Sequence, residues 1–394
     1  MTSRISYMGT KHELAPEVGR VVETCQPGRL FDAFAGMGAV AESFAGTRPV
    51  WTNDVQHFAH LASTCRLADE KGPLSSRAIA RLSRSLFACN MNRLREANAE
   101  ALRLNKKALK ADPFPDFRRL FAQVSSLKPS APSAYGCFTK TYSNGYFSIE
   151  QTAEIDSIRY ALENLRGQGL ITPAQFDWAL LALGAAALRV ANTTGHFAQF
   201  LTPSVKNFRR VQKQFQRNVW REWLASVTRI KPVGSSSWRT GNIATLSDST
   251  TLLTTRDHSS QAKVVYCDPP YTDDQYSRFY HVWETLVLYD YPVVTGQGRY
   301  RPGRFRTNFS LASRVEEAFR QMISDVASSE ADFVLSYPSN GLLHAIGGCP
   351  LALIREKYPA ARIAAEIEYS HSTMGASKGA AQSVVTERIY VGRA

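Results

Sequence analysis

The residues best suited to chemistry in this sequence are Asp268-Pro269-Pro270-Tyr271, which directly follow the apolar run Val264 to Cys267. A short apolar run that ends at such residues is typical of a buried strand followed by a turn. The prolines remove backbone donors and fix the chain direction, so the Asp268 carboxylate and the Pro269 carbonyl can face one point. Tyr271 adds a flat ring. An Asp-Pro pair can also simply close a strand, but the full set after a buried strand favours a functional site.

Two acceptors beside a flat ring suit the exocyclic amino group of a base such as adenine. That amine is a poor nucleophile because its lone pair is delocalised into the ring. Asp268 and the Pro269 carbonyl could bind its hydrogens and favour a tetrahedral nitrogen, which can attack a sulfonium methyl group in line. Tyr271 could stack on a base extruded from its helix. We therefore expect all four residues of the tetrapeptide to contribute to catalysis.

A glycine-rich turn near the start could bind a nucleotide-like cofactor. The run from Arg29 to Phe34 reads as a strand, and Ala35-Gly36-Met37-Gly38 leads from it into a helix-prone stretch. Glycines at the carboxyl end of a first strand let the backbone approach a ligand. We expect Gly36 and Gly38 to lie beside such a ligand. A turn of this kind is as often only a turn.

Three further residues could contact the same cofactor. Asp54 ends the strand-like run Pro49 to Asn53 and could accept both hydroxyls of a ribose, or could cap the next helix. Asp32 could contact the cationic end of the cofactor, or could be an ordinary carboxylate at a strand end. Lys11 could pair with a carboxylate of the ligand, although an ordinary N-terminal loop is the simpler interpretation.

The net charge of +13 and the pI of about 9.5 favour a polyanionic partner. The segment Lys71 to Lys128 holds 13 basic and four acidic residues, and Lys206 to Lys231 holds eight basic residues and the single acid Glu222. This concentration predicts a DNA-facing insertion on a near-neutral catalytic body, with Arg209, Arg210 and Lys213 as candidate DNA-binding residues. Solvated helix faces would explain the charge equally well.

The elements that must position these residues predict a doubly wound α/β domain built from both ends of the chain. We place the catalytic domain at residues 1–70 and 235–394 and a mainly helical insertion at 71–234. Strong helical patterns cover Ser148 to Leu165, which opens with a capping signal, and Pro173 to Ala191. Later strands are expected at 262–267, 332–337, 362–370 and 383–391.

The composition, with 44% hydrophobic and 21% charged residues in 394, is that of a soluble globular protein. No apolar run approaches the roughly 20 residues of a membrane helix, so we expect a cytoplasmic protein without membrane contact. The six cysteines have no metal-site or redox spacing, and neither a metal nor a disulfide is expected.

Taken together, several motifs resemble the Dam-like, alpha-group adenine-specific DNA methyltransferases. They are Tyr7-Met8-Gly9-Thr10-Lys11, Phe34-Ala35-Gly36-Met37-Gly38, Asn144-Gly145-Tyr146-Phe147-Ser148, Ile155-Asp156-Ser157-Ile158-Arg159, Ala191-Asn192-Thr193-Thr194-Gly195-His196, Asp268-Pro269-Pro270-Tyr271, Tyr276-Ser277-Arg278-Phe279-Tyr280-His281, Ser370-His371-Ser372-Thr373-Met374-Gly375 and Glu387-Arg388.

The resemblance implies a Rossmann-like domain that uses S-adenosyl-L-methionine, with a helical DNA-recognition insertion. It implies that Tyr7, Lys11 and Phe34 belong to the cofactor pocket and that Asp248 lies near the adenine of the cofactor. A helix N-cap is the simpler role for Asp248. The expected activity is site-specific methylation of the N6 amino group of adenine in double-stranded DNA by base flipping, with a possible cognate restriction endonuclease as partner.

Other functions remain compatible with parts of the pattern. Similar Pro-Pro-Tyr loops occur in enzymes that methylate RNA bases or protein glutamine, usually with Asn in place of Asp268, and in cytosine-amino methyltransferases, usually with Ser. The aspartate favours adenine, and the basic insertion favours duplex DNA. A catalytically inactive DNA-binding protein is a different alternative, which the intact cofactor loop and tetrapeptide disfavour.

Overall fold

The computed structural model describes residues 11–132, 134–255, 261–371 and 383–394. Internal contacts divide the chain into two compact units. We call Gly9–Lys71, Pro232–Ser277 and Phe305–Ala394 the sheet unit, and Gly72–Lys231 with Arg278–Arg304 the helical unit. No helix in these ranges combines the length and the apolar character that spanning a bilayer requires.

The sheet unit is built on seven strands in the order β3-β2-β1-β4-β5-β7-β6. The strands are β1 Arg29–Asp32, β2 Val50–Asp54, β3 Ile243–Leu246, β4 Ala262–Cys267, β5 Asp332–Pro338, β6 Arg362–His371 and β7 Ser383–Gly392. The first five strands of this order are parallel to one another, whereas β7 runs antiparallel to both β5 and β6. The chain order reverses between β1 and β4, which is where ligands bind in open α/β sheets.

Six of these strands lie where the sequence predicts them, within one or two residues at each end. The prediction missed β3, an edge strand of four residues that is too short to show a clear pattern. The last two strands of the sheet form an antiparallel pair, unlike the five parallel strands beside them. The α/β fold that the sequence predicts is confirmed.

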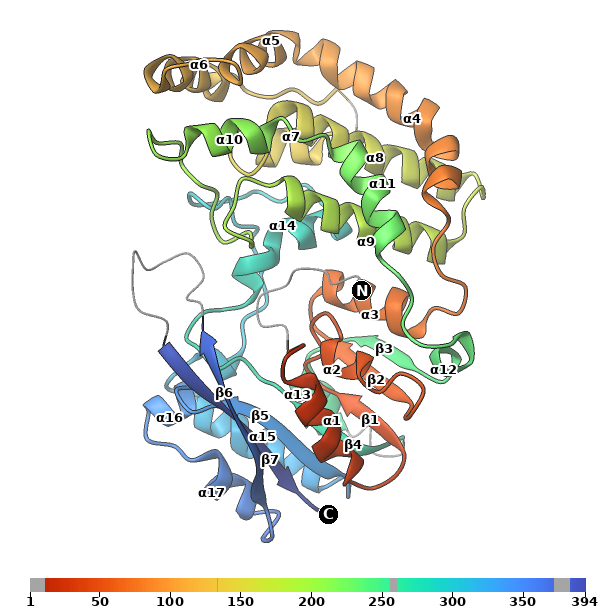
Figure 1. Cartoon of the computed structure of the whole chain (residues 1–394), viewed down its shortest axis with the longest axis vertical. Coiled ribbons are helices and arrows are strands. Elements are labelled where there is room, and N and C mark those ends of the chain that lie inside the picture. The colour runs from red at the N-terminus through yellow and green to blue at the C-terminus, as the bar shows by residue number, and fades with distance from the viewer. Residues whose placement is uncertain (1–10, 133, 256–260, 372–382) are drawn as a thin grey trace. The chain divides into compact units, whose positions relative to one another are not determined.

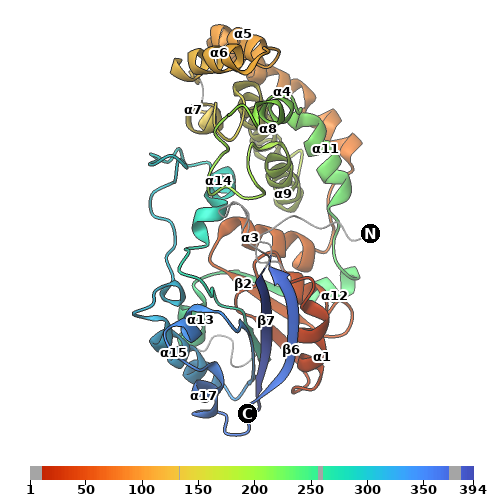
Figure 2. The ribbon, with the colours of Figure 1, turned by 60° about the vertical axis from the view of Figure 1, so that its left-hand side comes forward.

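Helices cover both faces of the sheet (Figure 2). Leu30 and Val264 face the buried side of α1, whereas Phe31 and Val265 face the opposite layer that contains α15. This alternation is what a strand buried on both sides requires. The helices of this unit are α1 Ala15–Glu23, α2 Ala39–Glu42, α3 His57–Ser63, η1 Thr64–Ala68, α12 Ser236–Thr240, α13 Ser249–Thr255, η2 Asn308–Ser310, α15 Val315–Ala327, α16 Leu342–Ala345 and α17 Pro350–Arg355.

The helical unit is organised around α8 and α9, which are buried along most of their length (Figure 1). Its helices are α4 Ser76–Ala97, α5 Ala99–Ala108, α6 Phe114–Ser126, α7 Cys137–Tyr142, α8 Ile149–Gly167, α9 Pro173–Val190, α10 Phe208–Phe215, α11 Val219–Arg229 and most of α14 Ser277–Leu288. The predicted capping signal of α8 is confirmed, because Ser148 and Gln151 form a capping box.

The segment Arg278–Arg304 groups with the helical unit, although the sequence analysis left it in the catalytic domain. The reason is packing. The indole of Trp283 on α14 fills the space beside Gly184 of α9, where a side chain would collide with it. The Tyr142 hydroxyl also lies 2.9 Å from the Thr285 hydroxyl oxygen. A helical pattern alone does not say which core a helix joins.

Candidate functional site

Three acidic residues lie at the carboxyl ends of adjacent strands: Asp32 ends β1, Asp54 ends β2, and Asp268 follows β4. Asp32 is 1% exposed, and its Oδ1 has no hydrogen-bond partner among the described residues. Burial first, and then the charge of Asp268, raise the pKa of Asp32 well above its ordinary value. Such a group would be stabilised as a carboxylate by a cation placed beside it.

The glycine-rich turn between β1 and α2 needs both of its glycines. Gly36 and Gly38 have φ values of 52° and 76°, in the region that side chains rarely adopt. A Cβ atom at Gly38 would also lie 2.7 Å from Cδ1 of Leu67. The turn is held by Arg66, whose Nη1 donates to the Met37 carbonyl at 3.3 Å while its Nη2 pairs with Glu42 at 2.8 Å.

Asp54 ties this turn to the next strand. Its Oδ2 accepts from the Gly36 amide at 3.0 Å, and its Oδ1 accepts from the Gln56 amide at 2.8 Å. Gln56, not Asp54, occupies the N-cap position of α3. Each carboxylate oxygen has a second lone pair, so these bonds leave acceptor capacity. The ribose-binding role of Asp54 stays a prediction.

Asp248 has the structural role that the sequence analysis named as the alternative. Its Oδ1 accepts from the Thr250 amide at 3.0 Å and from the Thr250 hydroxyl at 2.9 Å. Its carbonyl accepts the first intrahelical bond of α13 from Leu252. Asp248 is thus the N-cap of α13. The amide of the preceding Ser247 donates to the Asp54 carbonyl, which joins this helix start to the end of β2. The position of Asp248 near the adenine of a cofactor stays a prediction.

Lys11 lies between two carboxylates. Its Nζ is 3.1 Å from Oδ1 of Asp268 and 2.9 Å from Oε1 of Glu387, and the lysine and Glu387 side chains are 8% and 0% exposed. Burial alone would lower the pKa of Lys11, but Asp268 and Glu387 outweigh it and raise that pKa well above its ordinary value. Lys11 is therefore charged and occupied by protein carboxylates. Its predicted contact with a ligand carboxylate stays a prediction.

Burial also acts on the Asp268 carboxyl. Burial raises the pKa of Asp268 to about 6; Lys11 opposes this rise and Glu387 adds to it. Two buried carboxylates therefore share one ammonium group. Asp268 is ionised near neutral pH because Lys11 is there, and it stays close enough to its titration range to respond to small changes.

Two tyrosine rings lie on the side of Lys11, the partner of this carboxylate. Lys11 Nζ lies 5.3 Å from the centre of the Tyr271 ring, and the Tyr276 ring lies 6.4 Å from that of Tyr271. Phe34 packs edge-on against Phe309 at 5.6 Å. The Tyr271 carbonyl accepts from Leu342 at the start of α16, which fixes the loop after β4. The tetrapeptide thus presents one carboxylate and one half-buried ring together.

Some contributors to this arrangement were not assigned by sequence reasoning. The sequence places Glu387 in a motif without indicating its role, and no pattern indicates Arg66. Asn53 also escaped notice, although its Nδ2 donates to the carbonyls of Ala33 and Ser247 and so joins the ends of β1, β2 and β3. Tyr7, a predicted pocket residue, lies outside the described residues.

The predicted DNA-binding residues Arg209, Arg210 and Lys213 all lie on α10 in the helical unit and are exposed. Arg209 forms an ion pair with Asp112. Arg210 donates to the Thr193 carbonyl at 2.9 Å. The positive charge of Arg209 is thus matched by an acid, and a role of these three residues in DNA binding stays a prediction.

The known proteins that this chain resembles are named methylases or methyltransferases. The chain is 24% identical over 322 residues to Modification methylase LlaI of Lactococcus lactis subsp. lactis, covering 80% of this chain and 44% of that protein. It is 22% identical to Type II methyltransferase M.FokI of Planomicrobium okeanokoites, and the match covers 86% of this chain and 45% of that protein. It is 23% identical to Type II methyltransferase M.NlaIII of Neisseria lactamica, and the match covers 86% of this chain and 85% of that protein. The chain thus spans less than half the length of the first two relatives.

The family-level match is broader. The D12 class N6 adenine-specific DNA methyltransferases match residues 7–331, which include the glycine-rich turn and the Asp268 tetrapeptide. This match agrees with the family that the motifs indicate. The chain therefore belongs to the D12 class N6 adenine-specific DNA methyltransferase family.

Proposed function

We propose that this chain transfers a methyl group from S-adenosyl-L-methionine to the N6 amino group of adenine in duplex DNA. The observation that carries the proposal is the Asp268 carboxylate, which follows β4 at the switch point of the sheet, is held by Lys11 at 3.1 Å and adjoins the Tyr271 ring. Membership of the D12 class family supports the same reaction.

The residues around this point fit a cationic cofactor. Asp32 feels the negative charges of both Asp268 and Asp54, and its Oδ1 is buried without a partner among the described residues. A ligand that carries ammonium and sulfonium charges would relieve this excess of negative charge. The turn at Gly36 and Gly38 would hold the cofactor, with Asp54 at its ribose and Asp32 at its methionine end. When bound, S-adenosyl-L-methionine supplies a methyl group on a positively charged sulfur.

The chain's own residues then act on the target amine. Asp268 and the Pro269 carbonyl accept its two hydrogens, which orients the nitrogen lone pair away from them. The carboxylate also stabilises the positive charge that develops on the nitrogen as the methyl group leaves the sulfur, and the nitrogen then loses one proton to solvent. Tyr271 stacks on the extruded base and holds it at the depth of the carboxylate. Lys11 and Glu387 keep Asp268 in place.

Duplex DNA is the substrate that best fits the rest of the chain. The helical unit carries the two strongly basic segments, and DNA backbones are bound mainly through such charge. Relatives named modification methylase and type II methyltransferase support a role beside a cognate restriction endonuclease. We propose the helical unit as the part that recognises DNA.

The test is expression in a host that lacks DNA methylation, followed by sequencing with detection of modified bases. We expect N6-methyladenine at one short recognition sequence, and none in cells that express Asp268→Ala. Methylation of cytosine, or of RNA but not DNA, would overturn the proposal. Calorimetry with purified protein adds a second arm: failure to bind S-adenosyl-L-methionine would favour an inactive DNA-binding protein.

A further inference from the structure

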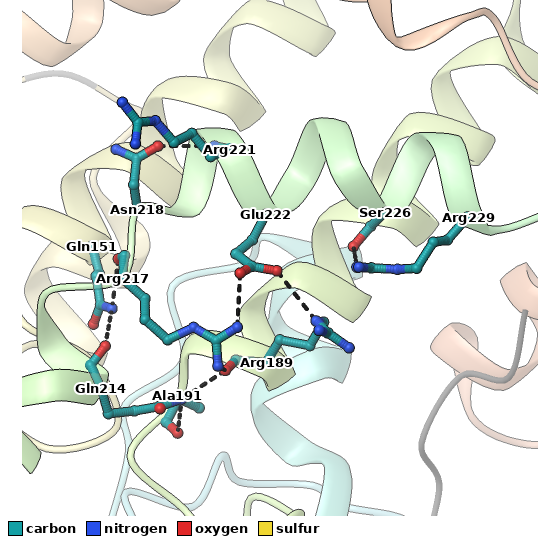
Figure 3. Close-up of polar contacts among 10 residues, drawn as sticks. All are labelled: Gln151, Arg189, Ala191, Gln214, Arg217, Asn218, Arg221, Glu222, Ser226 and Arg229. Carbon is teal, nitrogen blue, oxygen red and sulfur yellow. Dashed lines mark hydrogen bonds and ion pairs between the residues drawn. The ribbon is translucent and has the colours of Figure 1, made fainter. Parts of the chain in front are cut away.

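Two arginines pair with a single carboxylate on α11 in the helical unit, and a third arginine lies further along the same helix (Figure 3). Arg189 Nε lies 3.2 Å from Oε2 of Glu222, and Arg217 Nη2 lies 2.7 Å from Oε1 of the same residue. Arg229 lies on the same helix, and its Nη2 donates to the Ser226 hydroxyl at 2.8 Å. We call Arg189, Arg217 and Arg229 the arginine cluster.

Packing beneath the surface brings these residues together. Arg189 lies in the last turn of α9, and α11 crosses that helix with Trp223 fully buried, its indole nitrogen donating to the Ala179 carbonyl at 2.9 Å. Glu222 and Arg229 are seven residues apart on α11, which is two helical turns, so they share a face. Their positions therefore follow from a rigid core.

The guanidinium groups are oriented before any ligand arrives. Arg217 donates through Nη1 to the Arg189 carbonyl at 2.8 Å while its Nη2 pairs with Glu222. Arg189 pairs with Glu222 through Nε only, and no acceptor for its two terminal nitrogens occurs among the described residues. Half of the Arg189 side chain is exposed. The cluster therefore retains donors that point to solvent.

The cluster carries more positive charge than Glu222 can balance. Burial would raise the pKa of Glu222, but its hydrogen bonds and ion pairs with Arg217 and Arg189 lower it instead. Burial first, and then the nearby charge of Arg189, lower the pKa of Arg229. Three cations thus face one anion, and their mutual repulsion is a cost that a bound anion would remove.

We propose that the arginine cluster binds phosphates of the DNA backbone, an inference that rests on the proposed function because that function names DNA as the substrate. Guanidinium groups match phosphate oxygens in shape and charge. Two turns of α11 cover about 10 Å, enough for the cluster to meet two neighbouring phosphates of one strand. The cluster differs from Arg209 on α10, which already has Asp112 as its counterion.

The test measures DNA binding by the full chain through fluorescence anisotropy of a labelled duplex across a series of salt concentrations. Arg189→Gln and Arg229→Gln should each weaken binding to all sequences and reduce the slope of log affinity against log salt by about 1. In the double variant, the slope of log affinity against log salt should fall by about 2. Glu222→Gln keeps the shape and removes the anion, so binding should tighten.

Arg166→Gln is the matched control. Arg166 is an exposed arginine with an acidic partner, Glu163, at the end of α8 that adjoins the start of α9. Arg189 lies near the other end of α9. It is 16 residues beyond Pro173, the first residue of that helix, which is roughly 24 Å along the helix axis. Arg166→Gln should leave the salt slope unchanged. Thermal unfolding of every variant separates lost contacts from lost folding.

The outcomes separate this inference from the proposed function. A chain that methylates DNA while Arg189→Gln and Arg229→Gln keep the wild-type salt slope overturns the inference alone. Loss of affinity with Glu222→Gln, or loss of binding to single-stranded RNA but not duplex DNA in the arginine variants, also overturns it. A chain that binds DNA with the expected slopes but transfers no methyl group overturns the proposed function alone.

Discussion

Lys11 Nζ lies 3.1 Å from Oδ1 of Asp268, and this ion pair sets the charge of the proposed catalytic carboxylate. Asp268 is buried, which by itself favours its protonated form. The ammonium group of Lys11 opposes that effect and also lies near the face of the Tyr271 ring. One cation therefore stabilises the carboxylate and lies beside the ring on which we expect the base to stack.

The rate of methyl transfer should depend on pH through the Asp268 carboxyl. Burial raises the pKa of Asp268 to about 6, so the carboxyl gains a proton as the pH falls through that value. Only the ionised form accepts both from the target amine and from Lys11. We expect the single-turnover rate of methyl transfer to fall below a midpoint near pH 6 and to level off above it. A rate that stays constant down to pH 4.5 would contradict the role of Asp268.

Substitutions of its neighbours should move this midpoint in opposite directions. Glu387→Gln removes a negative charge beside Asp268, so the pKa of Asp268 should fall and the rate should persist at lower pH. Lys11→Met removes the positive charge and should shift the midpoint to higher pH. Lys11→Met also leaves two buried carboxylates unpaired, at a cost of about 3 to 5 kcal/mol in stability. Glu387→Gln is therefore the decisive variant: a purely structural Glu387 would not move the midpoint.

Asp268→Ala should reduce methyl transfer by on the order of a hundred- to a thousandfold or more, because it removes the acceptor that orients the amine. Binding of S-adenosyl-L-methionine should remain close to normal. Transfer of tritium from labelled cofactor to unmethylated DNA measures the first effect, and calorimetry measures the second. Asp268→Asn, which keeps the shape but not the charge, is the control for packing. Retention of most activity in the alanine variant would remove Asp268 from the mechanism.

Tyr271→Ala should weaken capture of the extruded base by about 1 to 3 kcal/mol, whereas Tyr271→Phe should behave almost like the wild type. The ring is half-buried beside Lys11, so the phenylalanine variant keeps the stacking surface. Fluorescence of 2-aminopurine at the target position reports the extruded base directly. A phenylalanine variant as poor as the alanine variant would assign the role to the Tyr271 hydroxyl group, which forms a hydrogen bond with the Tyr276 side chain.

The parts of the site that the sequence predicts are those with local signals. Asp268 follows a buried strand and precedes two prolines, and Asp248 precedes a helix, so short patterns indicate both. The partner of Lys11 does not have such a signal, because Glu387 lies 376 residues away in sequence and reaches Lys11 only when β7 joins the sheet. The placement of Arg278–Arg304 depends likewise on where Trp283 is buried, which a helical pattern does not encode.

The last prediction separates steric fit from backbone strain in the glycine-rich turn. Gly38 and Gly46 both have positive φ values, 76° and 85°, so alanine at either position should cost about 1 to 2 kcal/mol. A Cβ atom at Gly38 would also meet Cδ1 of Leu67 at 2.7 Å, whereas nothing lies within 4 Å of one at Gly46.

Gly38→Ala should therefore lower the unfolding temperature more than Gly46→Ala does, because the turn or Leu67 must shift to make room. It should also weaken binding of S-adenosyl-L-methionine, since the amides of this turn are proposed to face the cofactor. Gly46→Ala should leave that affinity unchanged. Scanning calorimetry and titration calorimetry on both variants measure the two effects. Equal cofactor affinity in the two variants would show that the turn at Gly38 does not form the pocket.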